Sequence, residues 1–439
     1  MAEVRPFCGY RYNEAKVGDL TKVICPPYDV ISIEQQQILR ARSPFNYIAL
    51  EESQSLPYDN KQNNKYTRAA ALLDKWINDG ILIKSNSPVF YLHEQSFTHN
   101  NTKYLRRGII ARVRLYNWEE MTVLPHEGTL ASPKADRINL LWALNANTSP
   151  VFGLFQDRDQ VLNQITKTAG KSKPILDITV DGERHVLRLI EDERTIGALA
   201  SFFSDKNLYI ADGHHRYESA LYYRDELAKC QGGLEPDHPA SFVMMTLVEF
   251  NDPGLLILPP HRLLRGISES ALNNLFNNLN QFFNIEKIAI NKKQGWESFQ
   301  QRLGDNQKIR LGLYGLGSDG LPQDSVLLLT LKNAAAVADM MPFHRSQMYK
   351  KLDVSIVDHL ILEEMLGLNS HEESLISYST NIDECFRLVN KGEYQLCFFV
   401  RAVTPHDIKT IADERDRMPR KSTYFFPKLP SGLVLNKLD

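Results

Sequence analysis

The stretch YIADGHHRYESALYYRDE (209–226) places two histidines and an arginine directly after an Asp-Gly pair. Apolar residues precede the pair, and apolar or long side chains recur at helical spacing from Tyr217 onward, which predicts a strand followed by a helix. Asp212 is then the expected N-cap, and Gly213 allows a tight turn and close approach of a ligand. The unpaired N–H groups of the first helical turn favour an anion at this corner.

His214, His215 and Arg216 fall in that first turn, where cationic side chains meet the positive end of the helix dipole. This mismatch predicts a bound anion, with phosphate as the first choice. Two alternatives stay open. In one, a histidine packs in the core, the other is solvated, and Arg216 pairs with a carboxylate such as Glu218 or Asp225. In the other, both histidines bind a metal, although adjacent helical residues diverge by about 100° and the favoured ligand spacing is i, i+4.

A second group of titratable residues lies in LPHEGTL, where a loop between a proline and a glycine carries His126 and Glu127. A carboxylate on a constrained loop beside cations is suited to act as a general base or a metal anchor. A helix-capping or solvated pair is the structural alternative. Further charged residues follow shortly after, at Lys134, Asp136 and Arg137, and we expect Arg137 to take part in phosphate binding.

Two basic stretches can contribute to the same site. LPPHRLL carries His261 and Arg262 at the end of an apolar run, where they either line the cleft or form a surface pair at the end of a strand. RDRMPRKSTYFFPK surrounds Lys421 and Ser422 with basic residues. These two residues are predicted to reach a bound phosphate, unless the run is simply a solvated face.

The elements that position these residues alternate between helices and strands. Amphipathic spacing predicts a helix within 64–82, and β-rich runs predict strands at 88–97 and 106–118 joined as a hairpin. Asp181-Gly182 between two alternating runs predicts a hairpin over 177–190. YGLGSDG (314–320) lies between strand-like runs and is interpreted as a turn. Such a sequence favours an α/β to α+β fold with mixed sheets and flanking helices.

The length of 439 residues exceeds what one hydrophobic core usually supports, so two or three subdomains are expected. The turn-forming segment NDPG (251–254) suggests a boundary there. We therefore expect an N-terminal α/β part over 1–250, which carries both titratable loops, and a C-terminal α+β part over 251–439.

Composition narrows the class of protein. The formal net charge of -2 offers no overall attraction to nucleic acid or to an anionic membrane. No segment reaches the roughly 18 apolar residues of a membrane span, and no apolar signal segment opens the chain. Five scattered cysteines without a C-x-x-C pair argue against a disulfide framework or a thiolate zinc site. A soluble, cytoplasmic protein that acts on small molecules is expected, with its oligomeric state left open.

These segments together resemble the domain-of-unknown-function 1015 family of bacterial and archaeal proteins. The resemblance covers nearly the whole chain and is specific for the family rather than for an activity. The matching stretches are RPF (5–7), PPYDVIS (26–32), LPHEGTL (124–130), PKADR (133–137), YIADGHHRYESAL (209–221), LPPHRLL (258–264), LDVSIVDHLIL (352–362) and MPRKSTYFFPKLPSGLV (418–434).

The pairing of PHE with a later DGHHR is also similar to the nucleotide-binding fold shared by ParB partition proteins, sulfiredoxin and free serine kinases. That resemblance implies a ParB/sulfiredoxin-like core with large insertions. It makes Glu127 the base for a serine hydroxyl, with His126 beside it, and makes Asp212, His214, His215 and Arg216 the corner that holds phosphates. The two motifs lie further apart here than in the small members, with the 177–190 hairpin between them.

The activity that this resemblance implies is phosphoryl transfer between free serine or O-phosphoserine and a nucleotide or pyrophosphate, in either direction. It implies Mg²⁺ and a phosphoryl donor, which is ATP, ADP or pyrophosphate. One rival hypothesis is a nucleotide-hydrolysing regulatory protein of the ParB type. Another is a metal-dependent phosphatase that uses Asp212, His214 and His261.

Overall fold

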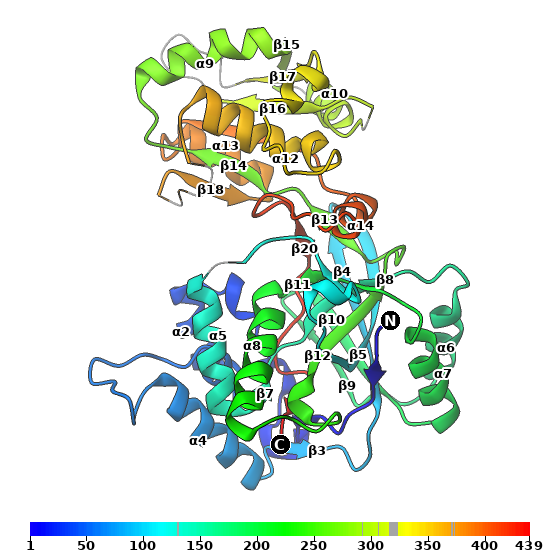
Figure 1. Cartoon of the computed structure of the whole chain (residues 1–439). Helices are drawn as coiled ribbons and strands as arrows, with labels where there is room; N and C mark the ends of the chain where they lie inside the picture. The colour runs from blue at the N-terminus through cyan, green and yellow to red at the C-terminus, as the bar shows by residue number, and fades with distance from the viewer. Residues whose placement is uncertain (130, 292, 306, 316–323, 370–371, 373) are drawn as a thin grey trace. The chain divides into compact units, whose positions relative to one another are not determined.

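The chain folds into two compact units. The computed structural model describes residues 1–129, 131–291, 293–305, 307–315, 324–369, 372 and 374–439 (Figure 1). The first unit comprises Met1–Pro125, Thr129–Leu256 and Pro427–Asp439, and the second comprises His126–Gly128 and Ile257–Phe426. The chain thus passes from the first unit to the second near residue 256, but its last thirteen residues, 427–439, return to the first unit. The expected division into 1–250 and 251–439 did not include this return, nor the grouping of 126–128 with the second unit.

A nine-stranded mixed sheet forms the centre of the first unit. Two neighbouring pairs are parallel, β6 with β11 and β8 with β12, and the remaining pairs are antiparallel. β1 (Val4–Arg5) pairs with β5 beside the main path. The order along that path is β6 (Val123–Pro125), β11 (Leu208–Asp212), β8 (Val151–Phe155), β12 (Phe242–Glu249), β5 (Thr102–Arg114), β4 (Phe90–His99), β10 (Glu183–Ile190) and β9 (Leu176–Val180).

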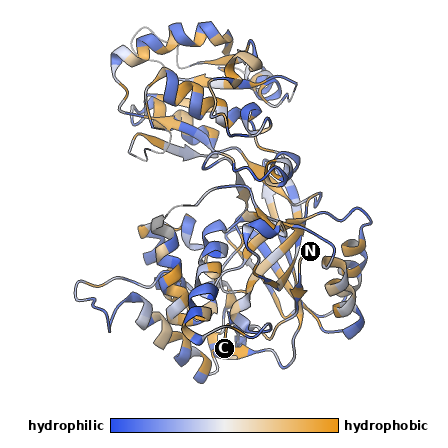
Figure 2. Cartoon of the chain, in the orientation of Figure 1, coloured by the Kyte–Doolittle hydropathy of each residue, from blue (hydrophilic) through white to orange (hydrophobic). Residues whose placement is uncertain are grey.

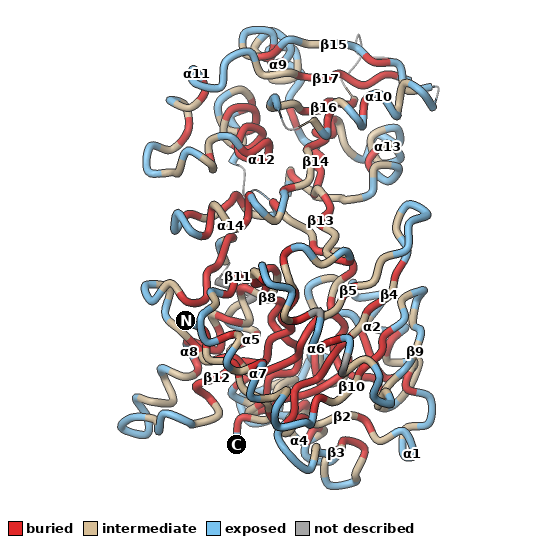
Figure 3. The backbone as a smooth tube through the Cα atoms, turned by 90° about the vertical axis from the view of Figure 1, so that its right-hand side faces the viewer, coloured by how far each residue is buried: buried red, intermediate tan, exposed pale blue. Residues whose placement is uncertain are grey.

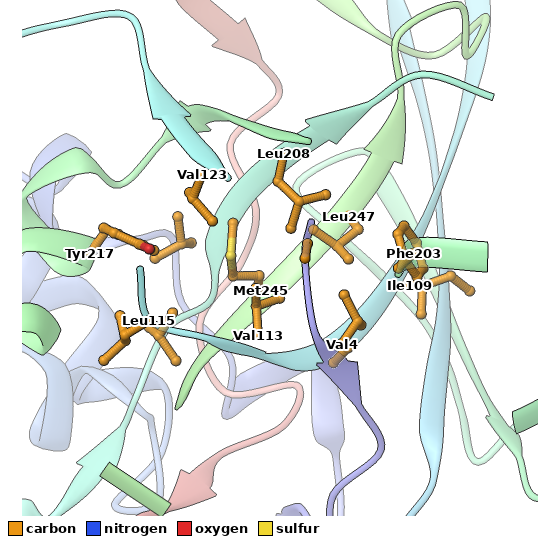
Figure 4. Close-up of a cluster of buried hydrophobic side chains, with 14 of the residues drawn as sticks. Val4, Ile109, Val113, Leu115, Val123, Phe203, Leu208, Tyr217, Met245 and Leu247 are labelled. Carbon is orange, nitrogen blue, oxygen red and sulfur yellow. The ribbon is translucent and has the colours of Figure 1, made fainter. Parts of the chain in front are cut away.

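Hydrophobic side chains cover both faces of this sheet. Successive side chains of a strand point to opposite faces. Ile109 and Met245 accordingly belong to one buried cluster, whereas their neighbours Ile110 and Met244 belong to the other. Figure 4 shows the first cluster, in which Tyr217 of helix α8 packs with residues of the sheet. The central strands are therefore buried along most of their length, as Figure 3 shows.

The helices of the first unit supply the outer layers. α4 (Lys65–Asn78) buries Leu73 and Trp76, and α7 (Glu193–Phe203) buries Leu199 and Phe203. α8 (His214–Gln231) packs against α5 (Ala131–Leu144). Figure 2 shows hydrophilic and hydrophobic residues interspersed along these helices.

Two hairpins of the sheet confirm predictions from turn chemistry. β4 and β5 are joined at Asn100 and Asn101, which have φ angles of 47° and 61°. β9 and β10 are joined at Asp181 and Gly182, with φ angles of 50° and 86°. Both positions of each turn are left-handed, which is the geometry of the two-residue turns that match strand twist.

The second unit is an α+β structure around a six-stranded antiparallel sheet. The strand order is β15 (Phe283–Ala289), β17 (Ser325–Leu331), β16 (Arg310–Tyr314), β19 (Leu396–Phe399), β14 (His261–Leu264) and β18 (Ile376–Ser379). Its helices include α9 (Glu269–Phe282), α10 (Lys293–Leu303), α13 (Ile382–Asn390) and α14 (Pro405–Asp413).

The fold class predicted from the sequence, mixed sheets with flanking helices and a C-terminal α+β part, is confirmed in both units. β16 and β17 flank the predicted YGLGSDG turn, but residues 316–323 lie outside the described residues. None of the helices in the described ranges has both the length and the hydropathy that crossing a bilayer requires.

Candidate active site

The corner after β11 is built as a tight left-handed turn. β11 ends at Asp212, Gly213 has a φ of 88°, and α8 begins at His214. A β-carbon added to Gly213 would lie 2.9 to 3.0 Å from atoms of the Arg216 guanidinium. Glycine is therefore favoured twice here, by backbone conformation and by the approach of the guanidinium. The predicted N-cap role of Asp212 is wrong, because Gly213 occupies that position and the cap has no side-chain hydrogen bond.

Asp212 instead binds two cations. Lys428 Nζ lies 2.5 Å from its Oδ1, and Arg216 Nη2 lies 2.9 Å from its Oδ2. All three side chains are largely buried, at 18% exposure for Asp212 and 11% for each cation. Burial favours the neutral acid, but Lys428 and Arg216 outweigh it and hold the pKa of Asp212 below its usual range. Two cations share one carboxylate, so this cluster carries a net positive charge beside the start of α8.

Arg216 connects the corner to a cavity. Its Nη1 donates to the Pro150 carbonyl oxygen, while its buried Nε has no hydrogen-bond partner among the described residues. The cavity has about 400 Å³ of empty volume, part of it open to solvent. Polar side chains in its lining are Glu51, Arg137, Asn147, Thr148, Ser149, Arg216 and Ser219.

The expected partners of Arg216 are engaged elsewhere. Glu218 accepts from Thr129 Oγ1 at 2.6 Å and from Lys134 Nζ at 3.1 Å, and Asp225 pairs with Arg224 at 2.8 Å. Arg216 therefore pairs with a carboxylate, as the structural alternative expects, but that carboxylate is Asp212 instead of Glu218 or Asp225.

The two histidines of the corner differ in burial. His214 is 8% exposed, and its charge contributes to the lowered pKa of Asp212. His215 is half-buried. The two histidines of the corner therefore differ in their access to solvent.

Arg137, predicted to bind phosphate, is neutralised within the first unit. Its guanidinium lies 2.5 Å from Asp136, 2.8 Å from Glu52 and 3.4 Å from Glu51. Burial opposes its charge, but these carboxylates outweigh burial and raise the pKa of Arg137. The same guanidinium stacks at 4.0 Å on the ring of Tyr28. The positive charge of Arg137 is therefore balanced by neighbouring carboxylates. Arg216 and Lys428 are the cations that contact Asp212 at the corner.

Sequence reasoning did not single out Tyr28, Glu51 and Lys428 as site residues. Burial raises the pKa of the Tyr28 hydroxyl to about 12, against the charges of Arg216 and Arg137. Tyr28 therefore stays a neutral hydroxyl beside the two arginines. Tyr28 lies in PPYDVIS, one of the stretches that carry the family resemblance. No local pattern in the sequence indicated that residue 28 lies near residue 216.

The loop with His126 and Glu127 groups with the second unit, where it lies against the basic C-terminal segment. Glu127 Oε1 accepts from the Lys421 backbone N–H at 3.0 Å, and the His126 carbonyl accepts from the Met418 N–H at 2.7 Å. The His126 side chain is fully buried, with Nε2 at 3.1 Å from Thr423 Oγ1. The two predicted segments, LPHEG and MPRKST, are thus brought together by these hydrogen bonds.

The strand that leads into this loop ends next to the strand that leads into the corner. β6 and β11 are parallel neighbours, with Pro125 opposite Ile210. Parallel strands end at the same edge of a sheet, and ligands of such sheets bind beyond these carboxyl ends. β6 therefore ends at Pro125 on the same side of the sheet on which β11 ends at Asp212.

Three other predicted site residues are buried in the second unit. His261 is 1% exposed and Arg262 is 0% exposed, so the pair lies neither at a surface nor at an open cleft. Arg262 donates to the Pro260 carbonyl at 2.7 Å and to Asp358 at 3.3 Å. Burial and the neighbouring Arg262 lower the pKa of His261 to about 3. Ser422 is 1% exposed, and its hydroxyl donates to the Pro419 carbonyl at 2.5 Å. These three polar side chains therefore lie in the interior of the second unit.

Metal-binding residues do not gather at the corner. The described part of the chain contains no group of three or more His, Cys, Asp or Glu side chains placed to hold a metal ion. Both carboxylate oxygens of Asp212 are engaged by cations. The phosphatase hypothesis based on Asp212, His214 and His261 gains no support from this arrangement.

Comparisons with known proteins agree with the resemblance seen in the sequence. The profile of a family described as "Protein of unknown function (DUF1015)" matches residues 4–355. No curated protein matches the chain.

Similar solved structures include a conserved hypothetical protein from Pyrococcus furiosus, at 12% identity and a TM-score of 0.35, covering 75% of this chain and 95% of that one. A free serine kinase in complex with AMP is 12% identical, with a TM-score of 0.34, covering 74% of this chain and 92% of that one. SbnI with a C-terminal truncation, from Staphylococcus aureus, is 9% identical, with a TM-score of 0.34, covering 74% of this chain and 87% of that one.

Proposed function

The chain belongs to the DUF1015 family of proteins of unknown function, and we propose that it is a small-molecule phosphotransferase acting between free serine and a nucleotide or pyrophosphate. The observation that carries this proposal is the charge at the corner. Arg216 and Lys428 both pair with the carboxylate of Asp212 at the start of α8. Positive charge near the positive end of a helix dipole favours a phosphate group.

In the proposed reaction the serine hydroxyl oxygen attacks the terminal phosphorus of the donor. A new O–P bond forms as the bond from phosphorus to the leaving phosphate oxygen breaks. The hydroxyl proton passes to a carboxylate, for which Glu127 is the candidate from the sequence, on its loop between a proline and a glycine. The cations of the corner stabilise charge on the transferring group.

Mg²⁺ fits this proposal as a cation carried by the phosphates of the donor. Magnesium keeps several water ligands and usually binds substrate phosphates with only one or two carboxylates. It would supply charge neutralisation across those phosphates, whereas the residues described above orient the donor and accept the hydroxyl proton.

The experiment is phosphorus NMR of the protein with serine and, in turn, ATP, ADP and pyrophosphate, and of the reverse reaction from O-phosphoserine. A phosphoserine signal that grows with any donor supports the proposal. Nucleotide hydrolysis without phosphoserine would favour the regulatory hypothesis. Absence of transfer in both directions with every donor would exclude the phosphotransferase.

Two variants separate binding from chemistry. Arg216→Ala should weaken donor binding by about 10- to 150-fold, since it removes charged hydrogen-bond donors. Glu127→Gln should reduce turnover by about 100-fold or more while donor affinity changes little. Arg224→Ala is the matched control, because Arg224 lies on the same helix but binds Asp225, Asn117 and the Leu115 carbonyl. Equal effects of Arg216→Ala and Arg224→Ala would contradict a specific role for the corner.

A further inference from the structure

The cavity beside the corner contains a buried carboxylate that is only partly satisfied. Glu51 is 1% exposed and lines this cavity. Its Oε1 accepts from Ser149 Oγ at 2.7 Å, and Arg137 Nη1 lies 3.4 Å away. Its Oε2 has no hydrogen-bond partner among the described residues. A buried carboxylate oxygen without a partner is costly, so a donor from a ligand would be stabilising.

The cations nearest Glu51 are occupied by other groups. Arg137 makes shorter contacts with Asp136 and Glu52, at 2.5 and 2.8 Å, than with Glu51. Arg40 donates to the Glu52 backbone carbonyl, and its charge acts on Glu52. Glu51 therefore makes a longer contact with Arg137 than Glu52 or Asp136 does.

Glu51 is held in place on the cavity wall. Ser149 Oγ, which donates to Glu51, also lies 2.7 Å from Ser431 Oγ of the returning C-terminal segment. Such a buried, hydrogen-bonded arrangement fixes the carboxylate before any ligand arrives, and preorganisation reduces the cost of binding.

The same cavity has a cationic wall. Arg216 lines it, and the Nε of Arg216 is a buried donor without a hydrogen-bond partner in the described part of the chain. The side chains that carry the unsatisfied acceptor and the unsatisfied cationic donor thus line one cavity. A ligand that carries both an ammonium and a carboxylate group satisfies both, and an α-amino acid is the simplest molecule with that pair.

We propose that Glu51 binds the α-ammonium group of an amino-acid substrate in this cavity, while Arg216 Nε binds its carboxylate. This inference rests on the proposed function, since it names the groups that recognise the serine acceptor. The ammonium donates to Glu51 Oε2, and Ser149 holds Oε1. Glu51 then selects α-amino acids over hydroxy acids of the same size.

The experiment measures binding without turnover, by calorimetric titration of the full chain with L-serine and with 3-hydroxypropanoate. The second ligand keeps the hydroxyl and carboxylate of serine but lacks the ammonium group. L-serine should bind at least about 30-fold more tightly, because loss of one partner of a buried charge pair has effects of that size or larger. Glu51→Gln should remove this preference and leave the affinity for 3-hydroxypropanoate unchanged.

Glu52→Gln is the matched control. Glu52 pairs with the same arginine but is not part of the cavity wall, so its amide variant should keep the preference for L-serine. Pyrophosphate binding and thermal unfolding of each variant show whether the fold persists. If Glu51→Gln does not fold, Ser149→Ala provides a second test. It removes one hydrogen bond to Glu51 and should weaken L-serine binding about 2- to 10-fold.

The outcomes separate this inference from the proposed function. Binding of L-serine that depends on Glu51, without phosphoryl transfer, would support the inference and exclude the phosphotransferase. Transfer to serine that is unaffected by Glu51→Gln would support the phosphotransferase and overturn the inference. No binding of L-serine, or equal binding of the two ligands by the unmodified protein, would also overturn the inference.

Discussion

At the scale of single residues, the corner depends on a carboxylate that holds two cations close together. Asp212 accepts from Arg216, four residues along the chain, and from Lys428, which is 216 residues away. Without the Asp212 carboxylate between them, the positive charges of Lys428 and Arg216 would repel each other. Asp212 therefore acts as the residue that positions the cations, in addition to any contact with a ligand.

Replacing Lys428 tests this arrangement. Lys428→Met keeps most of the side-chain length but removes the charge, so pyrophosphate affinity should fall by about 10-fold or more. The pKa of Asp212 should rise, because Lys428 is the stronger of the cations that lower it. Calorimetric titration with pyrophosphate measures the first effect. Lys229→Met, at the exposed end of α8, is the control, and the same loss of affinity in both variants would contradict a local role.

At the scale of elements, residues with a left-handed backbone form the turns that connect neighbouring strands and helices. Gly213 joins β11 to α8, and Asp181-Gly182 joins β9 to β10. Glycine is favoured at such positions because other residues carry a β-carbon that disfavours a positive φ. A β-carbon at Gly182 would have no atom within 4 Å, so only the backbone conformation, at φ 86°, opposes substitution there.

Matched glycine variants test this argument about the backbone. Gly182→Ala should lower the free energy of unfolding by about 1 kcal/mol, because alanine disfavours a positive φ. Gly197→Ala should raise it by about 0.5–1 kcal/mol, because Gly197 lies within helix α7 and has equally open surroundings. Urea unfolding measures both values. A stability change of the same sign in the two variants would contradict the explanation.

At the scale of the whole molecule, the C-terminal segment completes the first unit. Pro427 accepts from Arg106 at 2.6 Å, and Asn436 donates to Asn147 at 3.0 Å. The same segment delivers Lys428 to the corner. The first unit and its corner are therefore built from two parts of the chain, one that precedes the second unit and one that follows it.

Acid stability tests the buried groups of that unit. His93 and His185 are stacked and buried, with their ring nitrogens 3.2 Å apart. Burial, followed by the charge of Arg106, lowers the pKa of His185 from 6.5 to about 4. Between these values the unfolded chain binds a proton that the folded chain does not, so this histidine makes stability fall as pH falls from 6.5 toward 4.

The measurement compares the unmodified protein with His185→Gln by urea unfolding from pH 7.5 to 4.5. The difference between their unfolding free energies should change by about 1.4 kcal/mol per pH unit below pH 6.5 and stay constant above it. A difference that does not vary with pH would show that His185 titrates alike in the folded and unfolded chains.

The sequence by itself determined the local structure on which the site is built. The alternating hydrophobic pattern on both sides of Asp181-Gly182 was sufficient to predict a hairpin. The change from a strand-like to a helical hydrophobic pattern at 209–226 was sufficient to predict a strand-to-helix corner. Both signals come from a few neighbouring positions in the sequence. The class of fold followed from the order of such elements. The same patterns indicated that His214 and Arg216 stand at a helix start.

Only the tertiary structure decided which charges meet. Arg137 is neutralised by Glu51, 86 residues away, while Lys428 joins Asp212 across 216 residues. His261, Arg262 and Ser422 are buried, although their neighbours in the sequence suggested exposed chemistry. Electrostatic pairing and burial depend on distances in space, and sheet order together with the return of the C-terminal segment sets those distances. A local pattern therefore predicts where a charged residue lies on its element, but not which residue it binds.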